Sequence, residues 1–233
     1  MRIVTWNSFH GKSASKLSRL ETLHPDFAVL TEFTRPHPED SSLLWFGDKP
    51  MKGIAAIASP AYTIIPVPAR ETPPYYIPLF VKGPQSFFVI AVWSQKKSLY
   101  VEAILRALHA FHDLIEANPT VVLGDFNSNA VWDKKHSSGR NHTALVALCK
   151  KLGLVSAYHQ FFNEEQGKET RATLYFHRRQ ARPYHIDYCF IPEAWTQSLT
   201  SVQVGTYSEW ADASDHCPLI VDLVFPKAFG APS

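Results

Sequence analysis

The sequence is short of cysteine and has no long hydrophobic run. Its three cysteines, Cys149, Cys189 and Cys217, form no C-x-x-C pair, and their odd number argues against a disulfide framework. We interpret them as buried, reduced thiols and expect a cytoplasmic protein. No segment approaches the ~18 apolar residues of a membrane-spanning helix. The N-terminus lacks a signal-peptide pattern, so we expect no membrane partner.

The chain also lacks a strong charge of either sign. Its formal net charge is +2, from 23 basic and 21 acidic residues. Proteins that hold DNA by charge alone usually carry a larger basic excess, so long-lived, non-specific duplex binding is not indicated. The 233 residues, 45% of them hydrophobic, suffice for a full core. We expect a monomer with one domain over residues 1–226 and a C-terminal tail over 227–233.

Short apolar runs rich in β-branched residues dominate the chain and predict strands. These runs cover residues 3–6, 27–30, 54–58, 62–67, 77–81, 87–92, 121–123, 186–191 and 219–225. Three helices are predicted between them, capped by Ser13, Ser98 and Asn141. Pro119 lies beyond the second helix, and Gly153 ends the third. Runs of strands with segregated helices predict mixed sheets covered by helices.

Polar residues gather at the ends of these apolar runs. They are Asn7, Glu32, Asp125, Asn127, Asp187, Asp215 and His216. Any single one could be an ordinary turn residue. Asp187 differs, because an aspartate inside an apolar strand needs a partner to offset its desolvation. Five such clusters in one chain favour convergence on a common cleft over coincidence.

These residue types suit phosphodiester hydrolysis. A hard cation can neutralise the phosphate oxygens and stabilise the leaving alkoxide. Mg²⁺ or Mn²⁺ prefers the oxygen ligands that Asp, Glu and Asn offer. A protonated histidine can donate a hydrogen bond to the developing charge, while a buried aspartate fixes its ring.

The same residues fall into an ordered set of motifs. They read Ile-Val-Thr-Trp-Asn at 3–7, Leu-Thr-Glu at 30–32, Gly-Asp-Phe-Asn at 124–127, His-Ile-Asp-Tyr at 185–188 and Ser-Asp-His at 214–216. In this order they resemble the endonuclease/exonuclease/phosphatase superfamily, and the features of the chain suggest a small bacterial member. The resemblance implies an α/β (α+β) fold, a four-layer α/β/β/α sandwich of two mixed β-sheets flanked by helices, with a cleft at the strand ends.

The resemblance also implies a role for each motif residue. Glu32 would bind the metal with Asn7 beside it, and Asp215 would complete the metal shell. Asp125 would orient or deprotonate the attacking water. The other implied catalytic residues are Asn127, which would hold Asp125 and the phosphate, His216, which would donate to a phosphate oxygen, and Asp187, which would orient His216.

One position departs from the family pattern. Many members carry a catalytic His or Tyr where this chain has Trp93, which offers a single N–H donor and no titratable group. Trp93 can still donate to phosphate, or a histidine elsewhere can substitute for the missing group. The candidates for that substitution are His159 and His177, although each is individually more typical of a surface or core histidine.

Substrate contacts are assigned to Trp93, Asn129, Arg178 and Arg179. The basic segment 177–182 can contact a phosphate backbone or form a solvated hairpin tip. The segment 134–136, Lys-Lys-His, is more typical of a solvated loop. Aromatic residues can stack on unpaired bases but are more often core residues. Those considered for stacking are Trp93, Trp132, Tyr158 and Trp210.

We therefore predict a divalent-metal-dependent phosphodiesterase, with a nuclease as the leading reading. It would hydrolyse DNA, single-stranded or damaged DNA included, to a 5′-phosphate and a 3′-hydroxyl, and RNA remains an alternative. A second reading keeps the chemistry but changes the substrate to a small phosphate ester or a lipid head group. A third interpretation is a catalytically weakened binding module, because a protein can keep its fold after losing its catalytic activity.

Overall fold

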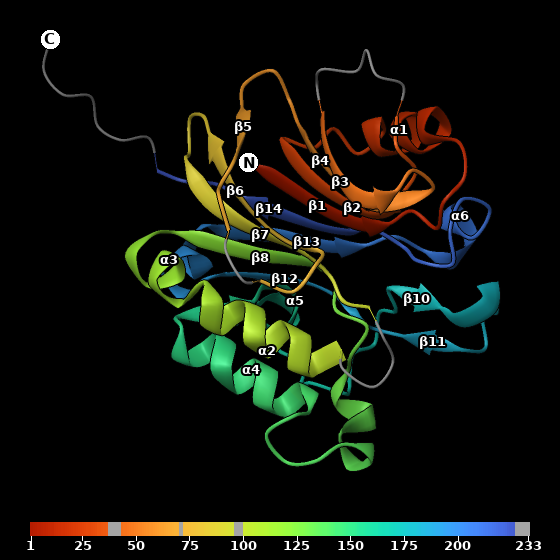
Figure 1. Cartoon of the computed structure of the whole chain (residues 1–233). Helices are drawn as coiled ribbons and strands as arrows, with labels where there is room; N and C mark the ends of the chain where they lie inside the picture. The colour runs from red at the N-terminus through yellow and green to blue at the C-terminus, as the bar shows by residue number, and fades with distance from the viewer. Residues whose placement is uncertain (37–42, 70–71, 96–99, 227–233) are drawn as a thin grey trace, which may run out of the picture.

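The computed structural model describes residues 1–36, 43–69, 72–95 and 100–226 (Figure 1). The first six-stranded sheet has the order β13 (Leu199–Val204), β14 (Leu219–Leu223), β1 (Arg2–Asn7), β2 (Phe27–Phe33), β4 (Lys52–Ala58) and β3 (Leu43–Lys49). The second has the order β5 (Thr63–Pro66), β6 (Tyr76–Lys82), β7 (Phe87–Trp93), β8 (Thr120–Asp125), β12 (Asp187–Pro192) and β9 (Leu154–Ser156).

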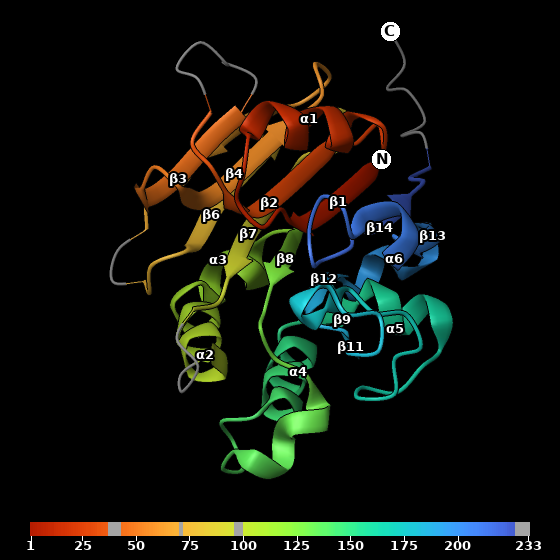
Figure 2. The ribbon, with the colours of Figure 1, turned by 90° about the vertical axis from the view of Figure 1, so that its right-hand side faces the viewer.

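Helices cover the outer faces of both sheets. They are α1 (Ser13–Glu21), α2 (Tyr100–Ala110), α3 (His112–Ala117), α4 (His142–Lys151), α5 (Ala157–Phe162) and α6 (Tyr207–Trp210). Figure 2 shows the layers from the side, with α1 over the first sheet and α2 and α4 under the second. Of the helices in the described ranges, none is both long and apolar enough to span a membrane. The predicted four-layer α/β/β/α sandwich is confirmed.

Three buried clusters hold the layers together. The largest lies between the sheets and includes Ile3 and Val29 from the first sheet and Val89 and Val121 from the second. A second joins α2 and α4 to the second sheet, and a third joins α1 and α6 to the first. Strands buried on both faces carry continuous apolar runs, which explains why the sequence shows runs rather than strict alternation.

Strand direction places the polar residues at one end of the sandwich. Strand β1 is parallel to β2 in the first sheet, and β7 is parallel to β8 in the second. Asn7 at the end of β1 and Asp125 at the end of β8 meet across the two sheets, where Asn7 Nδ2 lies 2.9 Å from Asp125 Oδ2. Strand β12 runs antiparallel to β8 and begins at Asp187, directly opposite Asp125. Strand β14 is antiparallel to β1, so the segment preceding Leu219 reaches the same end.

The helix predictions are partly wrong. Helix α1 begins at Ser13, and the capping position belongs to Lys12, which makes no side-chain cap. The second predicted helix is two helices, α2 and α3, with a break at Phe111, and Ser98 lies outside the described residues. Asn141 is confirmed as a cap, because its side chain accepts a hydrogen bond of 2.9 Å from the Ala144 N–H.

Five strands were not predicted, namely β3, β9, β13 and both strands of a short hairpin. Strands β3 and β13 lie at the edges of the first sheet and are largely half-buried or exposed. Strand β13 presents no apolar run, whereas β3 begins with one, Leu-Leu-Trp-Phe at 43–46, that was not predicted as a strand. A short hairpin, β10 (Leu174–Tyr175) and β11 (Pro183–Tyr184), projects beside the strand ends (Figure 1). Its tip carries the basic segment 177–182.

Gly124 is required by the close approach of β7 and β8. Its φ is +143°, and a Cβ there would lie 1.8 Å from the Val92 carbonyl oxygen. We expect Gly124→Ala to lower the free energy of unfolding in urea by well over the ~1–3 kcal/mol of a strained backbone alone. Gly139 is the matched control: its φ is +86°, but an added Cβ meets nothing within 4 Å. Equal losses for both variants would refute the steric argument.

Candidate active site

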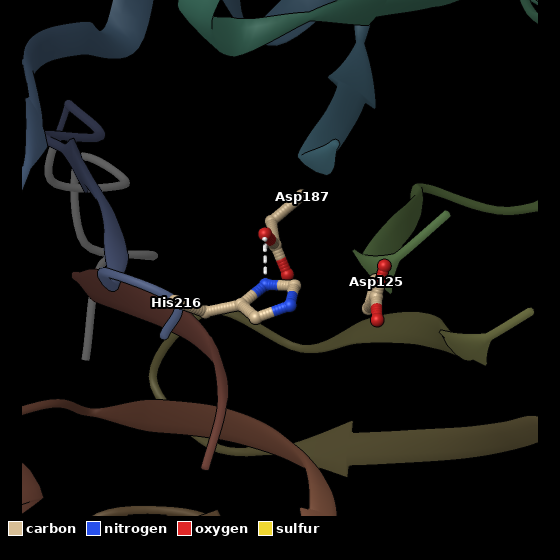
Figure 3. Close-up of side chains that lie close together, drawn as sticks. All are labelled: Asp125, Asp187 and His216. Atoms are coloured by element: carbon tan, nitrogen blue, oxygen red, sulfur yellow. Dashed lines mark hydrogen bonds and ion pairs between the residues drawn. The ribbon is translucent and has the colours of Figure 1, made fainter. Parts of the chain in front are cut away.

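Three side chains meet at the strand ends. Potential ligand atoms of Asp125, Asp187 and His216 lie within 4.8 Å of one another, and all three residues are buried. Figure 3 shows the His216 ring beside both carboxylates. Its Nδ1 faces Asp187, and the other ring nitrogen, Nε2, is turned toward Asp125. The residues come from β8, the start of β12 and the segment before β14. The sequence therefore predicted this convergence of separate strand ends.

Asp187 and His216 form a buried ion pair. His216 Nδ1 donates to Asp187 Oδ2 over 2.8 Å, and the Asp187 carboxylate is fully shielded from solvent. Burial alone would lower the pKa of His216, but the charge and hydrogen bond of Asp187, helped by Asp125 and Asp215, raise it to about 10. The imidazole is therefore charged at neutral pH, with its second N–H free to donate.

Asp125 is held by three amide donors. Its Oδ1 accepts from the Asn127 backbone N–H at 2.9 Å, and its Oδ2 accepts from the side-chain amides of Asn7 and Asn127, each at 2.9 Å. Burial, followed by the nearby charge of Asp187, raises the pKa of Asp125 to about 7. A carboxylate with this pKa can take up a proton near neutrality, as a general base must.

Asn7 links two carboxylates. Its Nδ2 also donates to Glu32 Oε1 at 3.3 Å, while its Oδ1 accepts from the Phe9 N–H at 3.0 Å. Because that oxygen is already engaged, Asn7 acts here as a donor that positions Glu32 and Asp125. Glu32 has a φ of +51° and lies where the pairing of β2 with β4 shifts register, which directs its side chain out of the regular sheet.

His10 is a site residue that the sequence argument missed. Its Nε2 lies 2.9 Å from Glu32 Oε2, and its backbone N–H donates to the Glu32 carbonyl. Phe9 and His10 have φ values of +50° and +52°, so a left-handed turn folds the end of β1 back over β2. Positive φ is uncommon for such bulky residues, and no sequence signal indicated it.

The last motif closes over the first strand. Ser214 donates to the Asn7 carbonyl at 2.7 Å and accepts from the His216 N–H at 3.0 Å, and Trp6 Nε1 donates to the His216 carbonyl at 3.0 Å. Asp215 is half-buried beside them. Its Oδ1 and that of Asp187 are buried and have no hydrogen-bond partner within the described part of the chain. Both oxygens therefore remain available to a ligand.

Neither histidine proposed to replace the catalytic His or Tyr missing at Trp93 makes a contact with Asp125, Asp187 or His216. His159 is bonded to Ser156 Oγ at 2.8 Å and Glu169 Oε1 at 3.1 Å, in the interior behind β12. His177 lies at the exposed hairpin tip with a φ of +58°, against Phe176. Long-range packing, which the sequence does not encode locally, decided both placements.

Two predicted substrate contacts are turned inward. Trp93 is only 3% exposed and packs on Tyr75 in the core between the sheets, beside Asp125 in register. Asn129 is also 3% exposed: its Nδ2 donates to the His185 carbonyl and the Tyr188 hydroxyl, and its Oδ1 caps the Val131 N–H. The Asn129 amide is thus committed to protein partners and holds the loop that follows β8.

Arg178 reaches the rim of the site. The Arg178 guanidinium lies 5.2 Å from the centre of the Phe9 ring. The backbone carbonyl of Arg178 accepts a hydrogen bond from the Tyr207 hydroxyl at 2.7 Å. Arg179 is exposed at the same tip. Among the remaining aromatics considered for stacking, Tyr158 and Trp210 are buried, whereas Trp132 is half-buried.

The His216–Asp187 pair can be tested directly. In Asp187→Asn the buried imidazole loses its counter-charge while its desolvation remains, so the pKa of His216 should fall from about 10. Ring ¹⁵N chemical shifts of His216 followed over pH measure this change. Asp113→Asn, at a fully exposed carboxylate on α3, is the control and should leave the His216 titration unaltered. An unchanged His216 titration in Asp187→Asn would contradict the pairing.

Solved structures resemble this chain over nearly its whole length. A 3′ phosphatase, NExo, from Neisseria bound to product DNA hairpin has a TM-score of 0.73 and 18% identity, covering 97% of this chain and 100% of that one. A 3′–5′ exonuclease, NExo, from Neisseria meningitidis has a TM-score of 0.72 and 19% identity over the same shares. The AP endonuclease LMAP from Leishmania major has a TM-score of 0.71 and 10% identity, covering 97% and 88%.

No protein-family model and no curated protein sequence matches the chain. The similarity therefore lies in the three-dimensional structure, because the sequence identity to these proteins is only 10–19%. The chain shares the fold of these solved structures, and this fold is the sandwich that the resemblance of its sequence motifs implied.

Proposed function

We propose that the protein is a divalent-metal-dependent phosphodiesterase that hydrolyses DNA by in-line attack of water. The observation that carries this proposal is the buried convergence of Asp125, Asp187 and His216. The fold neighbours support it, since their names describe a 3′ phosphatase, an exonuclease and an AP endonuclease. The chemistry is assigned on the site, because fold alone does not imply function.

The residues present fit a hard cation. Glu32 and Asp215 would hold Mg²⁺ or Mn²⁺, because both present carboxylate oxygens at the strand ends and the buried Asp215 Oδ1 has no hydrogen-bond partner among the described residues. His216 is not a ligand in its charged form, since a metal needs a neutral imidazole. When bound, the ion neutralises phosphate oxygens and stabilises the leaving alkoxide.

Asp125 is proposed as the general base. Its pKa of about 7 lets its carboxylate accept a proton from the attacking water, and its three amide donors fix its direction. Asn127, whose Nδ2 also donates to the Ser94 carbonyl, keeps the Asp125 carboxylate from turning away. The proton of the water thus passes to an oxygen whose position is set before substrate arrives.

His216 is proposed to stabilise the charge that develops on phosphate. Its Nδ1–H is engaged by Asp187, so its second N–H can donate to a non-bridging oxygen. Asp187 acts through His216 by fixing its orientation and its charge. Arg178 and Arg179, held at the rim by the hairpin, would contact the phosphate backbone on either side of the scissile group.

We further propose a cytoplasmic monomer whose residues 1–226 form the catalytic domain. Its three cysteines, all buried and free, support a reducing compartment. The tail over 227–233 lies outside the described residues.

The proposal predicts metal-dependent cleavage by the wild type and its loss in Asp125→Asn. With Mg²⁺ or Mn²⁺ and a labelled DNA oligonucleotide, kcat should fall by ~10²–10⁴-fold in Asp125→Asn, the usual contribution of a positioned base. Asp113→Asn serves as the control for an exposed aspartate.

Chelation by EDTA should abolish the wild-type activity. Turnover that survives EDTA would contradict the mechanism, and equal rates in Asp125→Asn would indicate a contaminating nuclease. Hydrolysis of bis(p-nitrophenyl) phosphate without hydrolysis of DNA would replace the nuclease with an enzyme for small esters. Binding of DNA without any turnover would favour a non-catalytic module.

A further inference from the structure

A cavity of about 270 Å³ opens beside the active site. It lies between the start of α2, the segment that follows β8 and the short helix η1 (Ala130–Lys135). Its lining includes Tyr100, Asn127, Trp132, Lys135, His136 and Arg140. Asp125, Asp187 and His216 do not line it, so the cavity adjoins the catalytic group without being part of it.

Asn127 connects the cavity to the chemistry. Asn127 lines the cavity, and its side-chain amide donates to Asp125 Oδ2 over 2.9 Å. A ligand in the cavity that contacts Asn127 is therefore separated only by this residue from Asp125, the proposed general base. A nucleotide whose phosphate lies at Asp125 can place an adjacent base there, provided that this base has left its stack.

The cavity is large enough for one planar nucleobase, because its volume of about 270 Å³ is roughly that of nine water molecules at ~30 Å³ each. Tyr100 and Trp132 contribute half-buried aromatic rings, and Trp132 is supported by the Tyr184 ring 5.0 Å away. Stacking on such rings tolerates any base, because every base has a π-face.

The charges of the lining suit a nucleotide. Asp133 is occupied at the start of α4, where its carboxylate accepts from the His142 and Thr143 N–H groups at 2.8 and 3.1 Å. Glu102 is paired with Arg140 at 3.5 Å. The lining therefore carries two acids and two cations, and Lys135, which makes no ion pair within the described residues, is the cation that can meet the backbone of the bound strand.

Resting on the proposed phosphodiesterase function, we propose that this cavity binds one unpaired nucleobase of the strand whose phosphate lies at Asp125. The substrate class is then single-stranded DNA or a frayed end, rather than an intact duplex. Trp132 and Tyr100 supply the stacking surface, and Lys135 contacts the flanking phosphate. Arg178 and Phe9 lie on the hairpin side of the site and form a separate contact.

The first test measures binding without turnover. Fluorescence anisotropy of a labelled oligothymidylate in EDTA should give a Kd about 5- to 150-fold higher for Trp132→Ala, the loss expected for one base stack of ~1–3 kcal/mol. Trp132→Phe keeps an aromatic ring and should retain most of the affinity. Phe161→Ala, which removes an exposed aromatic ring from α5, should bind like the wild type. An unchanged Kd in a folded Trp132→Ala overturns the proposal.

The second test separates this site from the chemistry. The ratio of kcat/KM for the oligonucleotide to kcat/KM for bis(p-nitrophenyl) phosphate should fall in Trp132→Ala, because the small ester carries no base. Equal losses on both substrates would show a structural defect instead and overturn the proposal. If the wild type hydrolyses neither ester, the proposed function fails, while anisotropy still decides whether the cavity binds a base.

Discussion

Buried charge is the constraint on which the site depends. The register of β8 and β12 sets Asp125 opposite Asp187, so two carboxylates that are 1% and 0% exposed share one low-dielectric region. Such a pair is costly unless partners offset its desolvation and repulsion. His216 neutralises one carboxylate, and amide donors from Asn7 and Asn127 satisfy the other. These three partners make the pairing of β8 with β12 tolerable, and that pairing sets the carboxylate of Asp125 beside the charged donor His216.

Local geometry around this group is strained in ways that serve the same end. Glu32 and Asn127 have φ values of +51° and +49°, each at the point where its strand ends. Backbone in this region costs ~1–3 kcal/mol and persists only where the surroundings over-determine it. Here the surroundings are the hydrogen bonds from Asn7 to Glu32 and from Asn127 to Asp125. The strained backbone therefore lowers the stability of the fold but holds the side chains of Glu32 and Asn127 in position before substrate binds.

Short-range patterns predicted mixed sheets covered by helices and the polar residues at the strand ends, whereas the four-layer arrangement was implied by the family resemblance. Asn7 and Asp125 lie at the ends of apolar runs, and the packing of the two sheets brings these ends together. His10 escaped prediction because its contact with Glu32 depends on a left-handed turn of non-glycine residues. Asn129 was assigned to substrate because the partners of its amide, at His185 and Tyr188, lie more than fifty positions away. Sequence patterns indicate which residues come together at the site. Packing decides which of their polar atoms remain available to bind substrate or metal.

The bridge made by Ser214 has a consequence for the order of synthesis. This side chain, near the C-terminal end of the described chain, joins the carbonyl of Asn7 to the backbone of His216. Strand β1 lies between β2, which follows it closely in the sequence, and β14, which is more than two hundred residues away. Asn7, Glu32 and Asp125 are therefore synthesised before the imidazole that completes their group. The proposed hydrolysis depends on the segment that carries His216 folding onto β1, so the site forms only after this long-range strand pairing.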